Sequence, residues 1–115
     1  MADPDSIVEV HSPRAGVVVI TPRSDVDLSR SPELRHALRD AADRRPERLI
    51  VDLGQVGYMD SSGLATLVEA MRTSKSSGAP LILSGMSQKV RAIFEIARLD
   101  QFFTIVGSVD DALVA

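Results

Sequence analysis

A short polar turn is the place in this sequence where chemistry is most readily expected. Asp60, Ser61, Ser62 and Gly63 follow one another directly before an apolar repeat of helical spacing. Hydroxyl groups at such a place can be nucleophiles, helix caps or acceptors of a phosphoryl group. Each of these roles needs different surroundings, so the rest of the sequence decides between them.

The first role, a serine nucleophile, has little support. A serine hydrolase needs a base within hydrogen-bond reach of the hydroxyl, and the two histidines, His11 and His36, lie on a predicted strand and on the polar face of a predicted helix. The Gly-x-Ser-x-Gly sequence of a nucleophile elbow is also absent around Ser61. A small hydrolase is therefore only our third hypothesis, and we expect no catalytic residue.

Cofactor and metal sites have no support either. The sequence contains no cysteine, and its two histidines do not form a pair at helical spacing. Neither of the glycine-rich loops that bind nucleotide phosphates is present. We therefore expect no cofactor and no metal ion.

The other two roles of the serine turn depend on its place at a helix N-terminus. In the simplest case the turn is only a helix start, because Asp and Ser side chains accept hydrogen bonds from the free amides of a first turn. The same amides and the helix dipole also favour an anion, and a phosphoserine carries about −1.5 to −2 charges. Asp60 would repel that charge, so the local terms nearly cancel. Phosphorylation would then change what docks on this surface more than it changes the fold.

Periodic apolar patterns predict the strands around this turn. Residues 6–11 and 16–20 predict an opening hairpin, and residues 48–53, 80–84 and 102–106 predict three further strands. Strands that alternate with helices need crossover connections, so we expect the later strands to be parallel and covered by helices. The prediction is an α/β fold with a mixed, mostly parallel sheet of about five strands, opened by a β-hairpin.

Four segments have the spacing and the caps of helices. The first begins with Ser31 as cap and ends near Arg44, and the second follows the serine turn. The third is capped by Ser87, and the fourth opens on a capping box that begins at Ser108. The buried stripes of the second and third helices are expected to be Leu64, Leu67, Val68 and Met71, and Val90, Ile93, Phe94 and Ala97. We expect these four helices to pack on the sheet in a single domain of residues 1–115, with residues 1–5 as a flexible N-terminal tail.

The bulk composition limits the classes of partner. A net charge of −3 and few aromatic residues oppose binding to nucleic acid. The sequence has no apolar run near the ~18 residues of a membrane span, and its start is unlike a signal peptide. With no cysteine to form disulfides, we expect a cytoplasmic protein without membrane insertion.

The stretch LIVDLGQVGYMDSSGLATLVEAMR, residues 49–72, resembles the STAS domains of bacterial anti-sigma-factor antagonists, also called anti-anti-sigma factors. The likeness covers nearly the whole chain and includes PLILSGMSQKVRAIFEIARLDQFFTI, residues 80–105. It implies a STAS-type fold and a noncatalytic protein that takes part in partner switching. In this family an anti-sigma factor with serine-protein-kinase activity phosphorylates its antagonist. The unphosphorylated antagonist binds that kinase and frees a sigma factor, and a metal-dependent serine phosphatase resets the cycle.

The resemblance also assigns roles to particular residues. The family's phosphorylated serine directly follows the aspartate, which implies Ser61 here, with Ser62 as the alternative. Since Ser62 enters the first helical turn, we expect it to point toward the domain and Ser61 to be the exposed hydroxyl. Asp60, Ser62 and Gly63 are expected to contact the partner, with Gly63 leaving room for the partner's backbone.

Two acids upstream complete the expected kinase-binding face. Asp25 and Asp27 fall where the family has a Gly-Glu-Leu-Asp turn, although Ser24 stands here in place of the glycine. The alternative for both acids is a purely local role in the turn and the helix entry. A second hypothesis for the chain is a STAS subunit of another complex, either a signalling scaffold or an ABC-type lipid-transport system. We expect a monomer or a weak dimer.

Overall fold

The alternating apolar segments of the sequence form one five-stranded sheet. The computed structural model describes residues 6–115, so the predicted tail at residues 1–5 lies outside the described residues. The strands are β1 (Val8–His11), β2 (Val17–Pro22), β3 (Arg48–Asp52), β4 (Leu81–Ser84) and β5 (Thr104–Val106). Their order in the sheet is β1-β2-β3-β4-β5, with β1 antiparallel to β2 and every later neighbour parallel. The predicted mixed sheet and its opening hairpin are confirmed.

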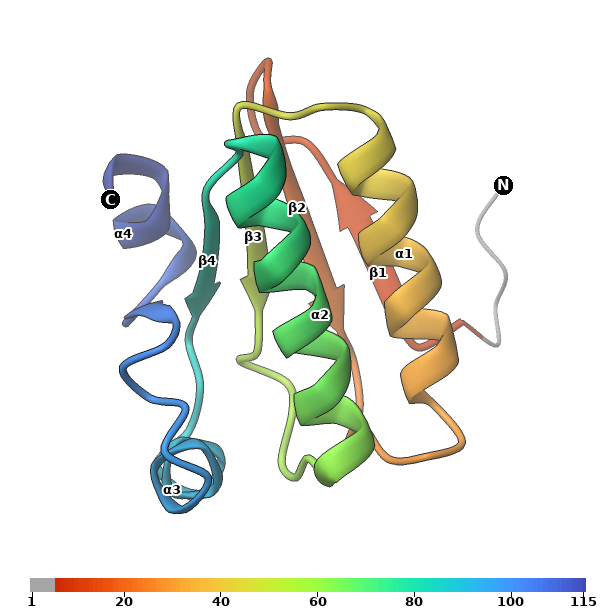
Figure 1. Cartoon of the computed structure of the whole chain (residues 1–115), viewed down its shortest axis with the longest axis vertical. Coiled ribbons are helices and arrows are strands. Elements are labelled where there is room, and N and C mark those ends of the chain that lie inside the picture. The colour runs from red at the N-terminus through yellow and green to blue at the C-terminus, as the bar shows by residue number, and fades with distance from the viewer. Residues whose placement is uncertain (1–5) are drawn as a thin grey trace.

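Four helices connect and cover these strands in the described part of the chain. They are α1 (Ser31–Asp43), α2 (Ser61–Ser77), α3 (Gln88–Ile96) and α4 (Val109–Val114). Figure 1 shows α1 and α2 side by side in front of the sheet. Within residues 6–115, none of the helices has both the length and the apolar character that crossing a bilayer requires.

The two faces of the sheet bury two separate sets of side chains. Strand order follows chain order, so right-handed crossovers place successive connecting helices over the same face. On that face Val18, Ile20, Leu49, Val51, Leu81 and Leu83 pack with buried residues of α1, α2 and α3. On the opposite face Val17, Val19, Ile50 and Ile82 pack with Ala112 of α4. The middle strands are therefore apolar at nearly every position instead of at every second one.

The short helix α4 is held by arginines from distant parts of the chain. Arg48 Nη1 donates to the carbonyl oxygen of Ala112 at 2.6 Å, and Arg14 Nη2 donates to that of Leu113 at 2.8 Å. The last carbonyls of a helix have no partner within the helix. These two guanidinium groups supply the missing donors and fix α4 on the sheet.

Some predicted helix ends are confirmed and others are wrong. Ser87 accepts a hydrogen bond from Val90 N, as a cap should, and Ser108 accepts one from Asp111 N. Ala97, however, is exposed, because α3 ends at Ile96 and Ala97 is only its C-cap. The predicted buried stripe of α3 is therefore one residue too long.

The start of α1 differs from the prediction as well. Its N-cap is Arg30, without a side-chain capping bond, and Ser31 is buried inside the first turn. Asp27 instead orders the turn before the helix, since its Oδ1 accepts hydrogen bonds from Ser29 N and Arg30 N and its carbonyl oxygen accepts one from Ser31 N. The predicted cap, Ser31, is thus the first residue of α1, and a turn ordered by Asp27 precedes it.

Candidate functional site

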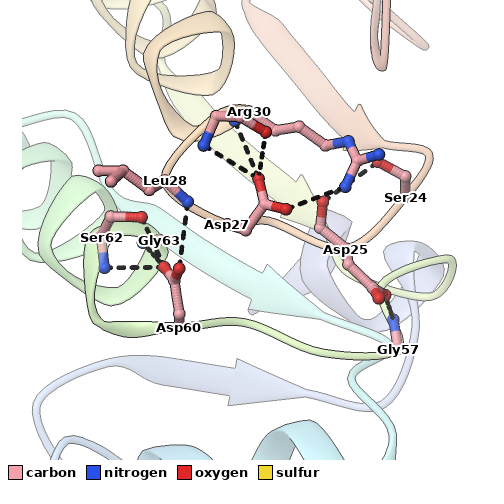
Figure 2. A network of polar contacts seen from close by, with 10 residues as sticks. Ser24, Asp25, Asp27, Leu28, Arg30, Gly57, Asp60, Ser62 and Gly63 are labelled. Carbon is pink, nitrogen blue, oxygen red and sulfur yellow. Dashed lines mark hydrogen bonds and ion pairs between the residues drawn. The ribbon is translucent and has the colours of Figure 1, made fainter.

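The serine turn lies against a segment that is distant in sequence. Val26 N donates to the Tyr58 carbonyl at 3.0 Å, and Asp60 N donates to the Val26 carbonyl at 3.1 Å. These bonds form an isolated parallel bridge between Val26 and Met59, whose side chains are both buried. The structure thereby brings Asp25 and Asp27 to the same edge of the domain as Asp60 (Figure 2).

Asp60 is the side chain that organises this edge. As N-cap of α2, its Oδ1 accepts hydrogen bonds from Ser62 N at 2.9 Å and Gly63 N at 3.2 Å. The same oxygen accepts a bond from Ser62 Oγ at 2.5 Å, while Oδ2 accepts one from Leu28 N at 3.1 Å. The Ser62 hydroxyl, followed by the backbone amides, lowers the pKa of Asp60 despite some desolvation. One carboxylate therefore joins the helix N-terminus to the loop that precedes α1 (Figure 2).

The two serines have different surroundings. Ser61 is the first residue of α2 and is exposed, whereas Ser62 is half-buried and its hydroxyl is bonded to Asp60. The expected difference in exposure is confirmed, and of the possible caps in this turn Asp60 is the N-cap of α2. Phosphorylation of Ser61, or of Ser62 in its place, stays a prediction.

Gly63 has an intramolecular role that the sequence did not indicate. It is buried, and a Cβ atom there would lie 2.5 Å from Met59 Cγ and 3.0 Å from both Cγ1 and the carbonyl oxygen of Val26. The space that the missing side chain leaves is filled by the domain itself. Contact between Gly63 and a partner stays a prediction.

Asp25 and Asp27 both stabilise the loop that carries them. Asp25 is exposed, and its Oδ1 accepts a hydrogen bond from Gly57 N at 3.1 Å. Asp27 accepts hydrogen bonds from Ser29 N and Arg30 N, and it forms an ion pair with Arg30 at 3.1 Å. The Ser29 hydroxyl is the main cause that lowers the pKa of Asp27. The local role is thus confirmed for Asp27, whereas Asp25 accepts its hydrogen bond from an amide 32 positions away. The place of both acids on a kinase-binding face stays a prediction.

Ser24, which stands where the family has a glycine, does not disturb the loop. Among residues 6–115, the non-glycine residues with a positive φ are Arg45 and Arg98, so Ser24 keeps an ordinary backbone conformation. A turn without a left-handed residue at this position has no need of glycine.

The arrangement contains few of the groups that other chemistries need. Within residues 6–115, no cluster of three or more His, Cys, Asp or Glu side chains is placed to hold a metal ion. His11, on β1, and His36, on α1, are both exposed. What the site does offer is an exposed hydroxyl, ordered hydrogen bonds around it and three carboxylates on the neighbouring backbone.

One residue of this edge was missed by sequence reasoning. Leu28 is 75% exposed, although its backbone N–H is fixed by Asp60. The only signal in the sequence is that Leu28 is an apolar residue outside every predicted helix and strand. Figure 2 shows it beside the first turn of α2.

Comparison with known proteins places this geometry in a family. The sequence model of one protein family, the STAS domain, matches residues 10–112 of this chain. An anti-sigma-B factor antagonist of Listeria monocytogenes is 31% identical over 81 residues, which cover 70% of this chain and 71% of the relative.

Solved structures agree on the fold. The crystal structure of an anti-sigma factor antagonist from Mycobacterium paratuberculosis superposes with a TM-score of 0.85 at 24% identity, covering 99% of this chain and 97% of that one. The phosphorylated form of SpoIIAA, a cell fate determinant of Bacillus, superposes with a TM-score of 0.72 at 20% identity, covering 92% and 96% of the two chains. The sheet, its helices and the matched residues together show that this chain belongs to the STAS domain family.

Proposed function

We propose that this chain is an anti-sigma-factor antagonist controlled by phosphorylation. Its unmodified form binds an anti-sigma factor that is also a serine kinase, and this binding frees a sigma factor in the cytoplasm. Phosphorylation of Ser61 ends the binding, and a metal-dependent serine phosphatase restores it. The chain acts as a binding protein, and the kinase is the protein that uses ATP.

The observation that carries this proposal is the contrast between the two serines. Ser61 presents its hydroxyl on the surface at the first position of α2, while the Ser62 hydroxyl is bonded to the Asp60 carboxylate. A kinase can reach the first without breaking the cap and can reach the second only by breaking it. The likeness to a curated antagonist adds support, since that relative is named for the same activity.

Electrostatics explains how one phosphate can act as a switch. The helix amides and dipole offset part of the added charge within the domain, so the fold is expected to persist. A partner carboxylate brought to ~5 Å would be repelled by ~3 kcal/mol per unit charge at an effective dielectric constant near 20. Repulsion of that size weakens binding about a hundredfold or more.

Phosphate transfer tests the position of the switch. The chain is incubated with ATP and each purified serine-kinase anti-sigma factor encoded in the source genome, and the product is mapped by mass spectrometry. We expect one phosphate on Ser61, none in Ser61→Ala, and unchanged position in Ser62→Ala. Phosphate found only outside residues 60–63 would contradict the proposal.

Binding measurements test the consequence of the added charge. Ser61→Asp should leave the free energy of unfolding within ~1 kcal/mol of wild type and abolish binding to the same anti-sigma factor. Ser76→Asp is the matched control, because Ser76 is an exposed serine of the same helix, roughly four turns away. If Ser61→Asp and Ser76→Asp both bind like wild type, the switch mechanism is wrong.

A further inference from the structure

Leu28 combines exposure with a fixed backbone at the edge of the proposed switch. Leu28 is 75% exposed, yet its N–H donates a hydrogen bond to Asp60 Oδ2 at 3.1 Å. The other oxygen of that carboxylate holds the first amides of α2. The main chain of Leu28 is therefore tied to the same group that orders the turn of Ser61.

Exposure alone does not distinguish Leu28, because single exposed apolar residues are common on soluble proteins. Ile96 is 85% exposed, at the end of α3, and Val114 is 82% exposed, at the end of α4. Each of them is the last residue of its helix. Leu28 differs in its place, because its own amide is bonded to Asp60, the carboxylate that also caps the helix turn of Ser61.

We propose that Leu28 is an apolar anchor that enters an apolar pocket on the anti-sigma factor. This inference rests on the proposed function and names a contact that gives the unmodified form its affinity. A leucine with an ordered backbone loses little further freedom on binding, so most of the gain from removing its side chain from water is kept.

The charges around Leu28 indicate the chemistry of the pocket rim. Asp25, Asp27 and Asp60 are the carboxylates of this edge, and Arg30 is paired with Asp27. Lys89 of α3 lies 6.0 Å from the ring centroid of Tyr58, which is 45% exposed. Even with both cations counted, negative charges are in excess. The partner surface that fits is thus an apolar pocket with a basic rim.

An apolar anchor also explains why phosphorylation of Ser61 would be effective. Burying Leu28 draws the first turn of α2 close to the partner, because Asp60 joins the two. A phosphate on Ser61 would then be held close to the partner carboxylate that repels it, away from the basic groups of the rim that face Asp25 and Asp27. The anchor and the switch would act through the same contact.

The test measures the affinity of full-length variants for the purified anti-sigma factor that binds wild type in the experiments above. Leu28→Ala is expected to bind at least tenfold more weakly, which corresponds to about 1.4 kcal/mol. Leu28→Met should stay within about threefold of wild type, because it keeps an apolar side chain of similar volume. Ile96→Ala is the matched control and should bind like wild type. Thermal unfolding of each variant verifies that it is folded.

Each outcome bears on a different claim. If wild type binds and Leu28→Ala binds equally well, the anchor is refuted and the proposed function stands. If wild type binds none of the anti-sigma factors, both fall. If the free chain instead forms a concentration-dependent dimer that Leu28→Ala abolishes in sedimentation experiments, Leu28 is covered by a second copy and the anchor is likewise refuted.

Discussion

Replacing Gly63 by alanine adds a single methyl group at a closely packed point of the site. The new Cβ would lie 2.5 Å from Met59 Cγ and 3.0 Å from Val26 Cγ1 and the Val26 carbonyl oxygen. Met59 is 1% exposed, so its side chain has little space to move into. The Val26 carbonyl is fixed by its hydrogen bond from Asp60 N. The clash must therefore be relieved by shifting the start of α2.

Two opposing effects decide how much Gly63→Ala changes the free energy of unfolding. Alanine is a better helix former than glycine by roughly 0.5–1 kcal/mol. Inserting an extra carbon into a well-packed core costs about 1–3 kcal/mol. The packing effect is the larger one here because one of the close atoms is backbone, so we expect a net loss of ~1–2 kcal/mol. For a domain of this size that loss lowers the Tm by roughly 4–8 °C.

Thermal and urea unfolding of Gly63→Ala, followed by circular dichroism, measure this loss directly. Gly107→Ala is the matched control, since a Cβ there would meet Asp111 Oδ2 at an ordinary 3.4 Å. The control is expected to change the unfolding free energy by less than about 0.5 kcal/mol. Gly63→Ala should also weaken partner binding, because the shift displaces Asp60.

A Gly63→Ala variant as stable as wild type would refute this reasoning. Equal stability would mean that Met59 and Val26 yield to the added methyl group at a cost no larger than the gain in helix propensity. A variant more stable than wild type would mean that the close packing beneath the serine turn has almost no energetic importance.

Three further outcomes follow from other parts of the structure. Leu67→Asp should unfold the domain, because Leu67 is fully buried and the new carboxylate would have no partner; circular dichroism at neutral pH checks this. The folded state lowers the pKa of Asp60 from its ordinary value of 3.8, so the stabilisation is present above that value and is lost as the pH falls through the folded-state pKa. The unfolding free energy of Asp60→Asn, measured as a function of pH, should accordingly fall less steeply than that of wild type below about pH 4. Arg48→Met removes the donor to Ala112 and should raise the hydrogen-exchange rates of α4 well above those of α2, with Arg14→Met the milder variant.

The strands and helices could be predicted from the sequence because each has its own local pattern. Fully apolar stretches mark the strands that are covered on both faces, and helical spacing marks α2 and its buried residues. Ser87 and Ser108 could be predicted as caps because the amides that donate hydrogen bonds to their hydroxyls are only three residues away.

The features that sequence reasoning missed depend on contacts between distant residues or on competition between neighbours. Ser31 has the type and spacing of a cap, but the turn that Asp27 orders leads the chain into the helix one residue before it, and the local pattern does not show this. The close packing at Gly63 requires Val26, which is far away in the sequence. The tie between Leu28 and Asp60 spans 32 positions and uses a backbone amide that every residue type has.

The strand order of the sheet has a consequence for how the chain can assemble during synthesis. Each new strand is added at the outer edge of those already made, since spatial order and chain order coincide. No later strand has to insert between two earlier ones, so a nascent chain can lengthen its sheet in the direction of translation. The two arginines that hold α4, at positions 14 and 48, are synthesised early and can bond its carbonyl groups only after α4 has emerged. The second layer therefore closes only after α4 has been made, and until then the apolar residues of β2, β3 and β4 that it covers stay accessible.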